Sequence, residues 1–191
     1  MCAAFPDFRL GNVLATSFTG TLSERHGAAV ERIPTPHRLI DWLVVNGFAV
    51  DFCTTARLDL ARELRKSIHT AATAAALQDA LPACAVQVIN DRSAQGRAAA
   101  ILTAEGQRQW RLSSPSCVED ALSVIASDAI GLIAGERDGK LALCASPTCQ
   151  AVFFDTSRSR TRRWRDMNTC GNRQKQARFT ANKRKNPRTA G

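Results

Sequence analysis

Three cysteines toward the C-terminal end of the chain have the spacing of metal ligands. Cys144 and Cys149 stand at the two shoulders of a short turn that contains Pro147, and 20 residues separate Cys149 from Cys170. Two thiolates held by a turn of this length can converge on one zinc ion at about 2.3 Å. The spacing therefore predicts a small zinc-centred module. Two alternatives remain open: the thiols are small buried apolar groups, or two of them form a disulfide.

The elements around these cysteines suit such a module. Residues 141–144 and 150–155 are predicted as two short strands on either side of the turn, and a basic helix is predicted over 172–179, directly after Cys170. About 50 residues with so few large apolar side chains cannot easily fold without a metal or docking against a larger domain. Trp164 and Phe179 are therefore expected in the core of the module rather than stacked on bases.

The positive charge of the chain is confined to the same segment. Residues 1–136 contain 12 Lys and Arg against 14 Asp and Glu, a net charge of −2, whereas residues 137–191 contain 14 against 3, a net charge of +11. A strong positive field on one small module is typical of a protein that binds a polyanion. The alternative is a solvated basic tail that aids solubility.

The N-terminal part predicts an α+β domain, residues 1–136, in which helices pack on a small antiparallel sheet. Leu58, Ala61, Leu64 and Ile68 recur at helical spacing and predict a long amphipathic helix over 55–79. Apolar runs and turn residues predict the other elements: a strand at 8–18, helices at 39–45, near 86–89 and at 116–133 with Ser116 as N-cap, and a hairpin of 98–103 with 107–112.

The C-terminal motifs resemble the CGNR zinc finger. The resemblance is carried by Cys144 and by residues 154–158, 162–164 and 170–175. The N-terminal part resembles the usual companion of that finger, the ABATE domain, at residues 14–16, 34–43 and 61–65. The resemblance implies a bacterial, stress-induced transcription regulator. It also implies a treble-clef-type finger, residues 137–191, and an α+β N-terminal domain that senses an unidentified ligand.

Two positions depart from the family pattern. In the N-terminal motif, Ala15-Thr16 stands where the family often has Asn-Thr, which bears on the ligand site that the resemblance implies. The more consequential departure lies in the finger. The family has a cysteine directly after the tryptophan, whereas Trp164 is followed by Arg165, and a guanidinium cannot ligate a cation. The resemblance thus implies zinc held by Cys144, Cys149 and Cys170 without the fourth family ligand. The fourth place is open to the carboxylate of Asp166 or to water; alternatively the zinc is lost and docking against the N-terminal domain holds the module.

The basic residues of the module form a loop set and a helix-and-tail set. The planar fork of arginine suits phosphates and guanine edges, and lysine suits diffuse backbone attraction. The helix after the last ligand of a treble clef commonly enters a groove, so its first basic residues are expected closest to DNA. The candidate DNA contacts are Arg158, Arg160, Arg162, Arg163 and Arg165 in the loop and Arg173, Lys175, Arg178, Lys183, Arg184, Lys185 and Arg188 in the helix and tail.

These observations predict a DNA-binding transcription regulator with zinc as cofactor, duplex DNA as partner and an unknown small-molecule effector. An RNA-binding protein, and a small-molecule-binding protein whose basic tail is incidental, remain the alternatives. We expect no enzyme, because the sequence has no Gly-rich phosphate loop, nucleophile elbow or paired-carboxylate motif. The cytoplasm is expected, because no apolar stretch approaches the roughly 18 residues of a membrane span and no leader pattern opens the sequence.

Overall fold

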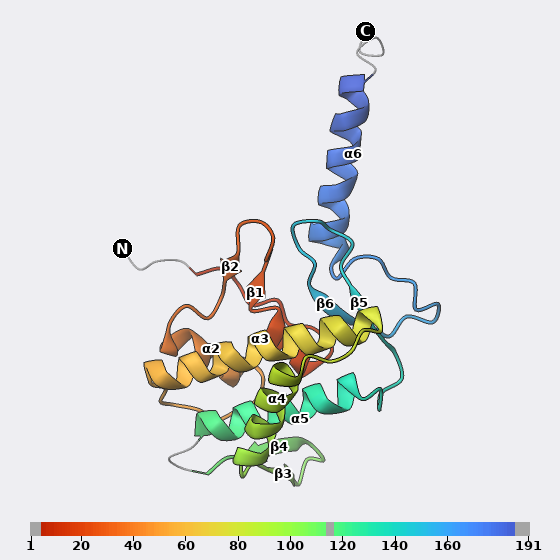
Figure 1. Cartoon of the computed structure of the whole chain (residues 1–191). Coiled ribbons are helices and arrows are strands. Elements are labelled where there is room, and N and C mark those ends of the chain that lie inside the picture. The colour runs from red at the N-terminus through yellow and green to blue at the C-terminus, as the bar shows by residue number, and fades with distance from the viewer. Residues whose placement is uncertain (1–4, 114–116, 186–191) are drawn as a thin grey trace.

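In the part of the chain that the structure describes, helices combine with three separate antiparallel pairs of strands (Figure 1). The computed structural model describes residues 5–113 and 117–185, apart from the side chains of residues 178, 181 and 183–185. The elements are, in order, α1 (Leu14–Thr19), β1 (Leu22–Ser23), β2 (Val30–Glu31), α2 (Pro36–Val45), α3 (Thr55–Leu77), α4 (Ala83–Gln95), β3 (Ala99–Leu102), β4 (Arg108–Arg111), α5 (Cys117–Ile133), β5 (Lys140–Leu143), β6 (Val152–Asp155), the π-helix η1 (Met167–Gly171) and α6 (Asn172–Lys185).

Helix α5 lies at the centre of the N-terminal part and packs against α1, α3 and α4. Its buried side chains include Val118, Leu122 and Ile125, which meet Leu64 and Ile68 of α3 in one apolar core. The helical spacing of apolar residues in α3 is thus the packing face of that helix, as predicted from the sequence. The predicted N-cap of α5, Ser116, lies outside the described residues.

The strand predicted at residues 8–18 is wrong, because α1 occupies residues 14–19. Five of its six residues are buried, so the segment shows no alternation of buried and exposed side chains that would suit a half-buried strand. Helix α1 is held by a residue that is distant in the sequence. The backbone N–H of Ala15 donates a hydrogen bond of 2.8 Å to the carboxylate of Asp128 on α5. Helix α4 is also longer than the short helix predicted near 86–89.

The predicted hairpin is confirmed as β3 and β4, which pair with Ala99 opposite Arg111. The hairpin is anchored by the buried carboxylate of Asp120, which accepts hydrogen bonds from the backbone N–H groups of Arg97 at 2.7 Å and Ser113 at 2.6 Å. The fold class, helices with small antiparallel strand pairs, agrees with the prediction, but within residues 5–113 the strands form two separate pairs, β1–β2 and β3–β4, rather than one sheet.

The C-terminal segment is joined to the N-terminal core by its own strands. Leu141 of β5 and Val152 and Phe154 of β6 are buried in the same cluster as α3 and α5. Helix α6, in contrast, projects away from the body of the molecule and ends far from the β3–β4 hairpin (Figure 1). Among the described residues, no helix combines the length and the apolar character needed to cross a bilayer.

Candidate metal centre and nucleic-acid interface

The three predicted ligand cysteines converge in one buried cluster. The sulfur atoms of Cys144, Cys149 and Cys170 all lie within 4.8 Å of one another. Around a tetrahedral zinc with Zn–S bonds of about 2.3 Å, sulfur atoms stand about 3.8 Å apart, so three thiolates in this arrangement fit one zinc ion. Phe153 and Trp164 pack around the cysteines and shield them from water. The arrangement is compatible with the zinc site predicted from the spacing.

The turn and the π-helix position the sulfurs. Cys144 follows β5, and its N–H donates to the carbonyl of Ala151 across the strand pair at 2.9 Å. The turn closes when the N–H of Cys149 donates to the carbonyl of Ser146 at 3.0 Å. Cys170 lies in the π-helix η1, and its sulfur atom lies within 4.8 Å of the sulfur atoms of Cys144 and Cys149. The disulfide alternative is not seen, because all three cysteines are free thiols.

The cluster favours a thiolate even without a metal. The thiol of Cys144 donates a hydrogen bond to the sulfur of Cys149, which raises the pKa of Cys144 and lowers the pKa of Cys149. The positive charge of Arg165 lowers the pKa of Cys149 further, against the effect of burial. Because zinc binds the thiolate form, this electrostatic environment prepares the site for a cation.

Asp166, the predicted candidate for a fourth ligand, is engaged in a turn of its own. The carboxylate of Asp166 caps η1, because it accepts hydrogen bonds of 2.9 Å from the N–H of Asn168 and from the hydroxyl of Thr169. Within the described part of the chain, the group of potential ligands at this place contains the three cysteines and not Asp166. A zinc bond from Asp166 stays a prediction.

Asp155, which the sequence reasoning did not single out, organises the basic loop. Its buried carboxylate accepts hydrogen bonds of 2.9 Å from the N–H groups of Ser157 and Arg162. Burial alone would raise its pKa, but these bonds and the charge of Arg162 bring the pKa below its usual range. The signal in the sequence was an acidic residue at the end of an apolar strand in an otherwise basic segment.

The five loop arginines differ in what they contact. Arg158 and Arg163 are exposed, and Arg160 pairs with the exposed Asp138. Arg162 is engaged within the module, since its guanidinium donates to the carbonyls of Trp164 and Arg165. Arg165 is only partly exposed and turns toward Gly20 of the N-terminal part. Contacts of these arginines with DNA stay predictions, and Arg158 and Arg163 are the ones best placed for them.

Helix α6 displays the second basic set. Arg173 and Lys175 are exposed near its base, and Arg178, Lys183, Arg184 and Lys185 follow along the same helix. Arg188 lies outside the described residues. The expectation that Phe179 belongs to the core is wrong, because 72% of this side chain is exposed. Helix α6 has no apolar face that would pack Phe179 against the module.

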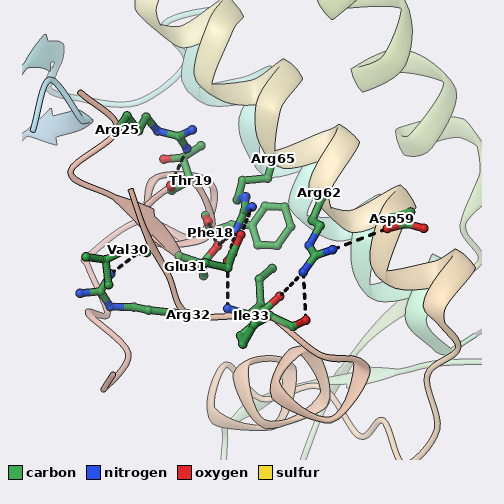
Figure 2. A network of polar contacts seen from close by, with 12 residues as sticks. Phe18, Thr19, Arg25, Val30, Glu31, Arg32, Ile33, Asp59, Arg62 and Arg65 are labelled. Carbon is green, nitrogen blue, oxygen red and sulfur yellow. Dashed lines mark hydrogen bonds and ion pairs between the residues drawn. The ribbon is translucent and has the colours of Figure 1, made fainter. Parts of the chain in front are cut away.

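The loop between β1 and β2 docks on the finger. Glu24 forms an ion pair of 2.9 Å with Arg173, and the N–H of His26 donates to the carbonyl of Thr148 in the cysteine turn at 3.2 Å. The strand pair itself is held to α3 by the carboxylate of Glu31, which meets the guanidinium of Arg65 (Figure 2). The N-terminal part therefore fixes the position of the finger and engages one of its basic residues.

Two family models match the chain. The profile of the ABATE family, described as putative stress-induced transcription regulator, matches residues 12–136. The profile of the CGNR zinc finger matches residues 140–183. A search of curated proteins gave no match.

Proposed function

Because the chain belongs to the ABATE family and ends in a CGNR zinc finger, we propose that it is a cytoplasmic, non-enzymatic transcription regulator that binds duplex DNA through α6. The observation that carries the proposal is the projecting helix itself (Figure 1). Residues 172–185 contain six Lys and Arg and no Asp or Glu. An α-helix fits the width of a DNA major groove. The cations of α6 would replace the counterions of the DNA phosphates.

The finger supplies the rigid base from which α6 projects. Cys170 lies two residues before the first residue of α6, so a zinc ion held by the cysteine cluster would fix the direction of α6 relative to β5 and β6. Arg173 stands beside that base, where it forms an ion pair with Glu24 and remains half exposed. We expect Arg173 to contact base edges and the cations farther along α6 to contact phosphates.

RNA binding is the second candidate, and the exposure of Phe179 favours it. Aromatic side chains that stand free among cations stack on unpaired bases, which are accessible in structured RNA and in single strands. Phe179→Ala separates the two candidates. For a duplex DNA binder the affinity for DNA should change little, whereas for a single-strand binder the loss should be about 1–3 kcal/mol per stacked base.

The test of the proposal is a titration of the zinc-loaded full chain with duplex DNA and with hairpin RNA at the same salt concentration. Tighter binding of duplex DNA, weakened by Arg173→Ala but not by Arg111→Ala on the distant β4, is the expected result. Tighter binding of RNA, or equal effects of the two substitutions on DNA binding, would contradict the proposal.

A further inference from the structure

A cavity of about 380 Å³ lies where the N-terminal part meets the finger. One wall comes from the segment before and within α1, and the opposite wall comes from β6 and the basic loop. The volume falls in the range of pockets that bind small molecules. Because both parts of the chain form it, a ligand held there would contact both of them.

The cavity has an excess of positive charge. Arg9, Arg162 and Arg165 line it, and the carboxylate that lines it, Asp166, is already engaged in capping η1. Arg9 also reaches across the junction, with its Nη1 atom 3.5 Å from the hydroxyl of Thr169. Because the guanidinium of Arg162 already donates to backbone carbonyls, Arg9 and Arg165 are the cations that would stabilise an anion there.

Arg165 supplies the observation that points to a ligand. Its Nη1 atom is buried and has no hydrogen-bond partner among the described residues. An N–H donor left without an acceptor away from water loses free energy, and such donors are rare in native proteins. The charge of Arg165 also acts on the buried Arg32. Burial is the largest cause that lowers the pKa of Arg32, and the positive charges of Arg9 and Arg165 lower that pKa further. An anion bound in the cavity would offset the charges of Arg9 and Arg165.

The rest of the lining is mixed, with Asn12, Thr16 and Ser17 beside apolar side chains. Leu10, Val152, Phe153 and Phe154 line the cavity, and the last three are buried side chains of β6. A bare inorganic ion would leave this surface without a partner, whereas an aromatic or aliphatic body would cover it. The cavity therefore suits a molecule with one anionic head and one apolar body.

We infer that this junction cavity binds a small organic anion, a carboxylate or a phosphate monoester, through Arg9 and Arg165. The inference builds on the proposed function in one respect, because it names the chemical class of the effector of that regulator. Arg165 is adjacent to the cysteine cluster, so a bound anion would act on the base of α6 through the same residue. The binding itself requires no DNA.

The experiment measures binding of benzoate and phenyl phosphate to the full chain by calorimetry, with benzamide and inorganic phosphate at matched ionic strength as comparisons. At least one of the two organic anions should bind saturably, and more tightly than benzamide or inorganic phosphate. The preference between them identifies the head group. Arg9→Gln and Arg165→Gln should each weaken the binding about tenfold or more, which is the usual loss for a charge-assisted hydrogen bond.

Arg111→Gln serves as the matched control, because it removes the same charge from an exposed site on β4. Its affinity for the anion should equal that of the native chain. No saturable binding of either organic anion, or an equal loss in Arg9→Gln and Arg111→Gln, would overturn the inference. If Arg165→Gln fails to fold, Arg9→Gln alone decides. A DNA titration of the same samples separates the claims: loss of DNA binding with intact anion binding contradicts only the proposed function.

Discussion

Glu31→Gln is expected to destabilise the fold because Glu31 neutralises a buried guanidinium. The two carboxylate oxygens lie 2.7 and 2.6 Å from the Nη1 and Nη2 atoms of Arg65, and the side chain of Arg65 is only 5% exposed (Figure 2). Removing one partner of a buried ion pair costs about 3–5 kcal/mol, because the other charge stays buried without compensation. The glutamine oxygen still accepts one hydrogen bond, so we expect a loss of about 2–3 kcal/mol.

Urea unfolding of the full chain measures this loss, and Glu63→Gln is the matched control. Glu63 also pairs with an arginine, Arg92, but at 3.3 Å and with 52% of its side chain exposed. Exposed pairs of this kind contribute about 0.2–1 kcal/mol, so the control should stay below 1 kcal/mol. Equal free energies of unfolding for the two variants would refute the reasoning.

The pH dependence of the Glu31 effect gives a second check. Burial would raise the pKa of Glu31, but the hydrogen bond and the charge of Arg65 bring it below the ordinary value of 4.5. The contribution of Glu31 is therefore present above that value and lost as the pH falls through the lower folded-state pKa. The difference between the native chain and Glu31→Gln should shrink in acid. A difference that stays constant to pH values well below 4.5 would contradict this account.

Three further predictions concern a histidine, the zinc site and the docking loop. Burial, with the charges of Arg25 and His26, lowers the pKa of His69 from 6.5 to about 4. The unfolded chain therefore takes up the proton first as the pH falls, and the native chain should lose about 2 kcal/mol more than His69→Gln between pH 7 and 5 in urea unfolding. Arg165→Cys adds a fourth thiolate and should raise zinc content and melting temperature, measured by elemental analysis and calorimetry; unchanged zinc content would contradict this. Glu24→Gln frees Arg173 and should tighten DNA binding about two- to fivefold, whereas weaker binding would show that the ion pair assists recognition.

Local patterns predicted the cysteine cluster and most helices because their causes lie close together in the sequence. The turn between Cys144 and Cys149 forces two thiols to converge, and the apolar spacing of α3 reports the face on which that helix packs. Cys170 was predictable from its place before a basic helical segment. The position of this residue relative to the other two required the tertiary fold.

The features that sequence reasoning missed depend on contacts between distant segments. Helix α1 is held by Asp128, more than a hundred residues away, which no local propensity reports. Phe154 joins the finger to the N-terminal core, and Arg165 faces a cavity formed with α1. Phe179 was assigned to the core on its apolar character alone, although α6 projects beyond any surface that could cover it. Apolar character does not by itself place a side chain inside.

The salt dependence of duplex DNA binding tests the central claim, that the cations of α6 bind phosphates. The logarithm of the association constant for the full chain should fall with the logarithm of salt concentration with a slope of about −3 to −5, since each neutralised phosphate contributes about 0.9. Changing residues 183–185 to glutamine should reduce that slope by about 2–3 units. The same charge removed at Arg92, Arg97 and Arg111 should leave it unchanged. A slope near zero, or equal slopes for the native chain and the 183–185 variant, would contradict the account.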